Sequence, residues 1–281
     1  MPEPLRDVIA ALDARYPPSL AEGWDAVGLV CGDPAETVHR VLFAVDPTSA
    51  VVDEVLETGA DLLVTHHPLL LTAVHGVPAD DPKGRLVHRL VRAGAALFVA
   101  HTNADRAPDH GVNDALAAAV GLTDAVPLEP TAADPRAGLG RVGRLAAPVS
   151  LREFAERVAA ALPATAGGVR IAGDPDRPVR TVAVCGGSGG SMVDAAVSAG
   201  ADVLLTSDLK HHAASEVAES SGPALCDVAH FASEWPWLPV AADVLRRDLS
   251  GRVEVAVSRR RTDPWTWQVG QHGDPAARPA D

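Results

Sequence analysis

Basic residues are scarce in this sequence, and long apolar runs are missing. Its 281 residues include 24 lysines and arginines against 37 aspartates and glutamates, which gives a formal net charge of −13. Nonspecific binding to nucleic acid or to an anionic membrane needs a basic surface, so we expect neither as a partner. Small polar or cationic partners, including metal ions, are compatible with this charge.

No apolar run reaches the length of a membrane-spanning helix. The first residues, MPEPLRDVIAALDARY, contain acids and prolines where a signal peptide has a basic start and a long apolar core, so we expect a cytoplasmic protein. Cysteine is also rare. Cys31, Cys185 and Cys226 are an odd number without a CxxC motif, which argues against a disulfide framework and indicates reduced, mostly structural thiols.

Short runs rich in β-forming residues alternate with helix-like segments along most of the chain. One such segment is the amphipathic SAVVDEVLETG, and Ser150 followed by Glu153 forms a capping box that predicts another helix start. Strands that alternate with helices predict an α/β fold with mostly parallel, or mixed, sheets. The runs that we interpret as strands lie at 41–46, 61–66, 96–101, 181–187, 201–208 and 223–230.

The two halves of the chain resemble each other. VDEVLETGADLLVT at 52–65 aligns without a gap with VDAAVSAGADVLLT at 193–206, and seven of the fourteen positions (Val, Asp, Gly, Ala, Asp, Leu and Thr) are identical. One strand later, AHTNAD at 100–105 matches AHFASE at 229–234, so each half places a histidine four residues before a carboxylate. This repetition predicts two duplicated, intertwined α/β units that face a shared cleft.

The repeat also suggests where the chain divides. We assign residues 1–128 to the first α/β repeat, 129–269 to the second, and 270–281 to a loose tail. The Gly-, Pro- and Asp-rich stretch LEPTAADPRAGLG at 128–140 is the best linker candidate.

Imidazoles and carboxylates gather at the carboxyl ends of the expected strands. Loops at this edge of an open α/β sheet converge on ligands, so side chains from both halves can meet there. A single histidine at a strand end is more often hydrogen-bonded or solvated than bound to a metal, but the repeated spacing and the adjacent histidine pair favour a metal cluster. The candidate metal ligands are His66, His67, His101, Asp105, His230 and Glu234.

The number of candidate ligands indicates two divalent ions per chain. Four imidazoles and two carboxylates suit Zn, Fe, Mn, Co or Ni, and they exceed what one four-coordinate ion takes. The backbone leaves the pleat where a strand ends, so His66 and His67 need not point apart. Ser207 and Asp208 occupy their place in the second half, so we expect an asymmetric cluster.

Two further segments at this edge offer groups for substrate binding. The stretch CGGSGGS, which includes Gly186 and Gly187, follows a strand and opens a helix, so its amides could bind an anion; the alternative is a flexible strand-to-helix turn. The stretch DLKHHAASEV offers Lys210 and His212 for substrate contact or proton transfer, and the alternative is a solvated helix start.

Five motifs are spread over nearly the whole chain: WDAVGLVCGDP (24–34), DLLVTHHPL (61–69), VAHTNADRAPDHGVNDALA (99–117), VAVCGGSGGS (182–191) and DVAHFASEWP (227–236). Together they make the sequence resemble the Nif-interacting-factor-like family of dinuclear metal centre proteins, whose members are commonly labelled GTP cyclohydrolase 1 type 2 homologues. The resemblance implies an intertwined two-repeat subunit, two divalent ions in the cleft and a ring-shaped homohexamer.

The resemblance also implies roles for single residues. Longer family members insert an extra domain between the repeats, and the span from about 118 to 180 is too short to hold one, so no role of that domain is carried over. Glu234 matches the family's bridging ligand, and His101 matches a residue that lies near the metals. The five residues that match the family's metal ligands are His66, His67, Asp105, His230 and Glu234.

Two classes of function fit these features. The first is a metal-dependent hydrolase, in which paired ions activate water to attack a small-molecule substrate, a purine nucleotide by the family label. The second is a regulatory or metal-delivery protein that binds ions without turnover, and a two-metal phosphoesterase is an intermediate option. The polar groups beyond the ligands, Lys210 and His212 among them, favour catalysis.

Overall fold

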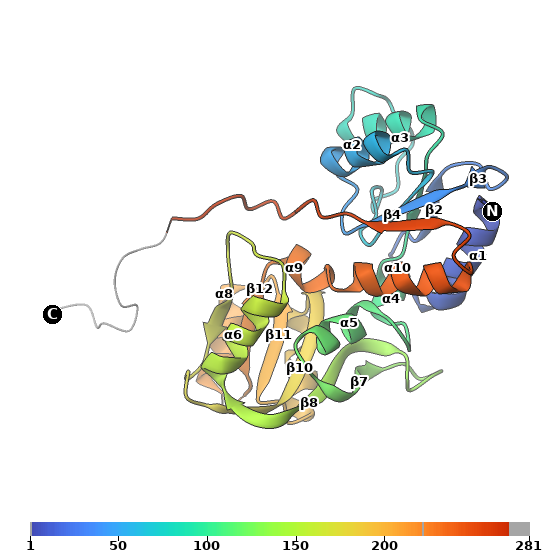
Figure 1. Ribbon diagram of the computed structural model, residues 1–281. Helices are drawn as coiled ribbons and strands as arrows, with labels where there is room; N and C mark the ends of the chain where they lie inside the picture. The colour runs from blue at the N-terminus through green and yellow to red at the C-terminus, as the bar shows by residue number, and fades with distance from the viewer. Residues whose placement is uncertain (1, 221, 270–281) are drawn as a thin grey trace.

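The computed structural model describes residues 2–220 and 222–269. Figure 1 shows two lobes, each built around one β-sheet, which confirms the expected α/β class. The tail expected at 270–281 lies outside the described residues. Within those described, no helix combines the length and the apolar character that crossing a bilayer requires.

The first sheet is mostly parallel. Its central pairs are parallel and only the edge strand formed by Gly28–Cys31 runs antiparallel to its neighbour. From one edge to the other its strands are β13 (Glu254–Val257), β4 (Arg40–Ala44), β5 (Leu62–Thr65), β6 (Ala96–Val99) and β2 (Gly28–Cys31). A separate two-stranded ribbon pairs β1 (Glu3–Pro4) with β3 (Thr37–Val38).

Helices cover both faces of this sheet, because successive strand residues point to opposite sides. Val41 and Phe43 pack in one apolar cluster with the helices at the two ends of the chain, whereas Leu42 and Ala44 pack in another with the two crossover helices. The first face is covered by α1 (Leu5–Arg15) and α10 (Trp237–Asp248), and the second by α2 (Ser49–Thr58) and α3 (Pro82–Arg92).

The second sheet is mixed. Its centre consists of two parallel pairs, and antiparallel strands extend it on both sides. Its strands are, in order, β7 (Thr123–Pro130), β8 (Gly138–Ser150), β10 (Pro178–Ser188), β11 (Val203–Ser207), β12 (Ala224–Val228) and β9 (Arg170–Ala172). Its faces pack against α5 (Val112–Ala119) and α6 (Leu151–Ala161) on one side, and α7 (Val193–Ser198) and α8 (His211–Glu219) on the other.

The three parallel strands β4, β5 and β6 of the first sheet correspond to β10, β11 and β12 of the second, in agreement with the aligned segments of the sequence. Each series ends in a short helix, α4 (Thr102–Asp105) in the first half and α9 (His230–Glu234) in the second. Two 3-10 turns, η1 (Pro18–Leu20) and η2 (Gly190–Met192), complete the fold.

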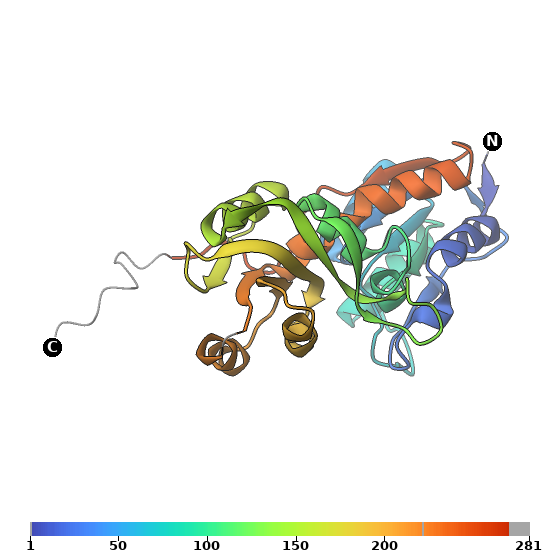
Figure 2. The same cartoon turned by 90° about the horizontal axis from the view of Figure 1, so that it is seen from below.

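The halves exchange elements. The chain leaves the second sheet after α9 and returns to the first, where α10 covers one face and β13 pairs in parallel with β4. Figures 1 and 2 show this returning segment, coloured orange to red, beside the blue strands of the first lobe. The stretch 128–140 differs from its interpretation as a linker, because β7 and β8 pair there as an antiparallel hairpin within the second sheet.

Candidate metal centre

The histidine pair lies immediately after β5. The amides of His66 and His67 donate to the carbonyls of Ala44 (3.2 Å) and Val45 (2.9 Å), so the backbone still follows β4. The two rings lie 5.0 Å apart with a tilt of 48° between their planes. Both face the carboxylate of Glu234, with His66 Nε2 3.4 Å from Oε1 and His67 Nε2 3.2 Å from Oε2. The neighbouring histidines therefore do not point apart.

The second half contributes α9, which begins at His230 and ends at Glu234. One turn of helix places the two side chains on one face, with His230 Nε2 2.9 Å from Glu234 Oε1. His230 Nε2 also lies 3.2 Å from Nε2 of His67 in the first half. The structure thus brings the 66/67 pair and the 230/234 pair, which are far apart in sequence, into contact.

His101 and Asp105 complete the set from α4 and its N-cap. The His101 ring lies 5.1 Å from the ring of His66 and 5.5 Å from that of His67. Asp105 Oδ1 lies 3.7 Å from His66 Nε2. Two groups have ligand atoms within 4.8 Å of one another and could hold a metal ion: His66, His67 and His101 form one, and His67, His230 and Glu234 the other.

Three buried ligand atoms in this cluster make no hydrogen bond of acceptable geometry among the described residues: His66 Nε2, Asp105 Oδ1 and Glu234 Oε2. His66 Nε2 and Glu234 Oε2 do have polar neighbours, at 3.4 and 3.2 Å. Their side chains are almost fully enclosed, His66 being 0% and Glu234 3% exposed. A buried polar atom without a partner costs about 1–3 kcal/mol, more when it is charged. Three such atoms in one cluster fit a site that a cation completes.

The Nδ1 atom of each of these histidines faces an oxygen that can accept its hydrogen bond. Asp46 binds His67 at 2.7 Å, Asp208 binds His230 at 2.6 Å, and Asp25 binds His101 at 2.8 Å. The Nδ1 of His66 lies 2.9 Å from the carbonyl of Ala100. An acceptor at Nδ1 fixes the proton there and leaves the Nε2 lone pair facing the centre, as metal-binding histidines require.

Sequence reasoning did not assign the three carboxylates that orient the histidines. Asp46 and Asp208 do carry a signal, since each comes shortly after a buried strand at the edge where the histidines lie. Asp25 has no such signal, because it lies in the loop before β2, and its contact to His101 spans 76 residues.

The imidazoles and carboxylates of the cluster shift one another's pKa values toward the charged forms. Burial would raise the pKa of the Glu234 carboxyl, but the surrounding imidazoles outweigh it and hold this pKa well below its usual range. Burial would lower the pKa of His67, but Glu234 and Asp46 raise it to about 11, and the same balance raises the pKa of His230 to about 9. Burial also raises the pKa of Asp105. The raised pKa values of His67 and His230 favour their protonated forms, which a metal ion has to displace.

The glycine loop at the end of β10 closes the back of the centre. A Cβ added at Gly187, whose φ is +66°, would lie 2.6 Å from Glu234 Oε1 and 2.9 Å from His230 Nε2, so no larger residue fits without displacing them. The amides of Gly186 and Gly187 donate to Asn113 Oδ1 and Ser233 Oγ, both at 2.9 Å. These two amides already have acceptors in the protein's own side chains, so they are not free to bind an anion.

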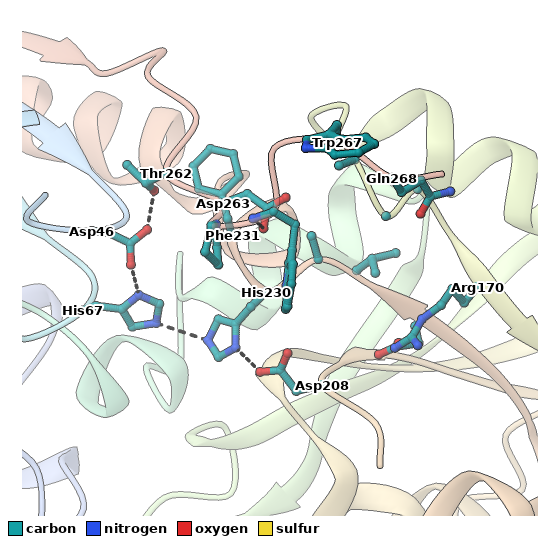
Figure 3. A pocket seen from close by; sticks show the side chains of 18 residues that line it. Asp46, His67, Arg170, Asp208, His230, Phe231, Thr262, Asp263, Trp267 and Gln268 are labelled. Atoms are coloured by element: carbon teal, nitrogen blue, oxygen red, sulfur yellow. Dashed lines mark hydrogen bonds and ion pairs between the residues drawn. The ribbon is translucent and has the colours of Figure 1, made fainter. Parts of the chain in front are cut away.

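A cavity of about 670 Å³ opens beside the centre. Figure 3 shows His67 and His230 at its base and the chain around Thr262 to Gln268 along its wall. Lys210 and His212 are exposed and do not line this cavity, so the structure does not bring them to the cluster. Arg170 lines it instead, paired with Asp227.

The profile of Duf34/NIF3 (NGG1p interacting factor 3) matches residues 4–264. The chain belongs to this family. Its Duf34/NIF3 relatives include a Streptomyces coelicolor protein, 53% identical over 271 residues and covering 94% of each chain. A Mycobacterium tuberculosis protein is 40% identical over 367 aligned positions that cover 93% of this chain and 96% of that one. Both are named "GTP cyclohydrolase 1 type 2 homolog".

Solved structures of the Duf34/NIF3 fold agree with this assignment. A Bacillus cereus protein related to NIF3 superposes with a TM-score of 0.87 at 25% identity, covering 94% of this chain and 99% of the other. A Staphylococcus aureus protein superposes with the same TM-score at 28% identity, covering 95% and 100%. The 367 positions aligned with the mycobacterial relative exceed the 281 residues of this chain, so that relative carries insertions that are missing here.

Proposed function

We propose that the cluster is a dinuclear divalent-metal centre and that the protein is a metal-dependent hydrolase. The observation that carries this proposal is the set of three enclosed ligand atoms without hydrogen-bond partners among the described residues. The residues that would hold the ions are His66, His67, His101, Asp105, His230 and Glu234.

Two ions fit the donor set better than one. Six donors exceed the four that a structural zinc site uses. The two carboxylate oxygens of Glu234 face different histidines, Oε1 toward His66 and His230 and Oε2 toward His67. A carboxylate placed in this way suits the role of a bridge between neighbouring ions, which is the role that the family resemblance implies for it.

The chemistry proposed is hydrolysis. A pair of divalent ions in such a centre supplies Lewis acidity and generates a nucleophile from water near neutral pH. The protein's own groups keep the ligands ready: Asp46 and Asp208 hold the Nδ1 protons of their histidines, and Gly187 leaves room for the carboxylate. The adjoining cavity is large enough for a small molecule, and the names of the relatives suggest a nucleotide as substrate.

Metal content tests the centre without reference to any substrate. Protein purified without chelator should contain about two divalent ions per chain by elemental analysis, of the Zn, Fe, Mn, Co or Ni group. Glu234→Gln keeps the shape of the side chain and should lose at least one ion. Glu156→Gln, which changes an exposed carboxylate on α6, is the matched control and should keep both. Equal metal content in all three proteins would exclude Glu234 as a ligand.

Turnover is tested separately with the metal-loaded protein. Hydrolysis of a purine nucleotide that is lost in Glu234→Ala supports the hydrolase, whereas turnover that survives this change refutes a two-metal mechanism. Cleavage of simple phosphoesters instead would indicate the phosphoesterase. Tight metal binding without any turnover would indicate a regulatory or metal-delivery protein.

We also propose a homohexamer, on the family resemblance alone. Light scattering on the purified protein should give six times the chain mass of 29.0 kDa.

A further inference from the structure

The end of the described chain runs from the first lobe along the cavity. It is fixed beside the first sheet, where the Ser258 amide donates to the Phe43 carbonyl at 2.8 Å. Further on, the hydroxyl of Thr262 donates to Asp46, the carboxylate that holds His67. The wall of the cavity is therefore connected to the metal centre through one hydrogen-bonded chain, which is visible in Figure 3.

Two tryptophans on this segment line the cavity. Trp265 is 72% and Trp267 74% exposed, although indole is among the side chains that gain most from burial. Two exposed indoles beside one cavity offer flat apolar faces against which a planar ring can stack.

The carboxylate of Asp263, between Thr262 and the tryptophans, has one oxygen that accepts no hydrogen bond from the described residues. It is only 7% exposed and lines the cavity, and its Oδ2 has no hydrogen-bond partner within residues 2–220 and 222–269. Its Oδ1 accepts only a long hydrogen bond, 3.4 Å, from the Trp265 amide. A buried carboxylate oxygen needs an N–H donor or a cation.

The other carboxylates of the cavity already have partners. Asp46 is bound to His67 and Asp208 to His230, while Asp227 pairs with an arginine. Asp263 is therefore a lone acceptor and not part of an acidic cluster, so a neutral ring edge with N–H donors satisfies it without the several carboxylates that a metal ion would require.

We propose that this cavity binds a planar nitrogen heterocycle that presents N–H donors, with guanine as the best-fitting nucleobase. The ring stacks on Trp267 and Trp265, and Asp263 accepts from its N–H edge. Guanine offers two neighbouring donors on that edge, whereas adenine places a ring acceptor beside its amino group. The inference rests on the proposed function, because it assigns the recognition of the substrate's base to a wall next to the metal ligands.

Calorimetric titration of the metal-loaded protein with guanosine monophosphate, adenosine monophosphate and ribose 5-phosphate tests this assignment. Wild type should bind guanosine monophosphate about tenfold more tightly than adenosine monophosphate, as expected for hydrogen bonds to a charged acceptor. Trp267→Ala should weaken both nucleotides at least about fivefold and leave ribose 5-phosphate unchanged. Asp263→Asn should abolish the preference for guanine.

Neither substitution should disturb the fold, since Trp267 is exposed and Asp263 makes one long hydrogen bond within the part of the chain that the structure describes. Val197→Ala removes an exposed apolar side chain that does not line the cavity and should bind as wild type does. Equal affinity for both nucleotides in wild type, or unchanged affinity in Trp267→Ala and Asp263→Asn, would overturn the inference. Elemental analysis of the same samples distinguishes this failure from failure of the metal centre, because neither variant should change the metal content.

Discussion

Asp46→Asn is the substitution that most directly tests how the centre is built. Asp46 does not reach the ligand atoms; it binds Nδ1 of His67 at 2.7 Å, the length of a charge-assisted hydrogen bond. Asparagine preserves the size of the side chain but removes its charge. If its amide group turns toward His67, it also forces the proton onto Nε2, the nitrogen that faces Glu234.

The magnitude follows from the role of such partners in metal sites. Loss of the acceptor behind a metal-binding histidine lowers metal affinity about 10- to 100-fold, or about 1.4–2.8 kcal/mol. Asp46 is a favourable case, because its second oxygen is held by the Thr262 hydroxyl and the carboxylate is therefore fixed toward the ring. We expect a change toward the upper end of this range.

Competition with a chelator of known affinity, using Zn²⁺ or Mn²⁺ as the probe, measures the change. Thr262→Val removes only the hydroxyl on the other oxygen and should have a smaller effect. Asp53→Asn, which changes an exposed carboxylate paired with Arg89 on the surface, should have none. If Asp46→Asn bound both probe metals as tightly as wild type, His67 would not bind metal through Nε2, and the proposed geometry would be refuted.

Three further outcomes are expected. Gly187→Ala places a Cβ 2.6 Å from Glu234 Oε1 at a φ of +66°, so thermal unfolding should show a less stable protein and elemental analysis a loss of metal. Burial disfavours the charged forms of His230 and His67, but Glu234 raises their pKa values to about 9 and about 11. Metal must displace both protons below pH 9, so affinity should fall by up to about a hundredfold per pH unit there. Arg141→Met should cost about 3–5 kcal/mol in chemical denaturation, since Arg141 is 1% exposed and its loss leaves Asp114 and three carbonyls without their donor.

The parallel strands of both halves could be predicted because they are buried on two faces. Val41 to Ala44 and Val203 to Leu205 are all fully enclosed and form continuous apolar runs, which is the pattern that the sequence displays. The candidate ligands followed from the same pattern, since strands that end at one edge bring their next residues together. The duplication then indicated that each half contributes a histidine and a carboxylate to the same cluster.

Elements that depend on contacts between distant segments were not predictable in this way. The stretch 128–140 has the composition of a linker, and only the register of β7 against β8 places its two ends in a sheet. The return of β13 to the first sheet leaves no local mark, because Glu254–Val257 could pair at any free edge. Lys210 shares the edge of the candidate ligands in sequence, but it does not line the cavity, although Asp208 two residues earlier does.

One methylene group adds to the asymmetry that the missing histidine pair of the second half creates. Asp105 and Glu234 occupy the same place in the two repeats, four residues after a histidine. The shorter Asp105 lies 3.7 Å from His66 in its own half, whereas Glu234 reaches across to His66 at 3.4 Å and His67 at 3.2 Å. The first repeat supplies the adjacent histidines and the second the long carboxylate, so neither repeat contains a complete centre. The first half alone would lack the shared carboxylate of Glu234, and the second half alone would lack the adjacent histidines, so neither could hold the proposed pair of ions.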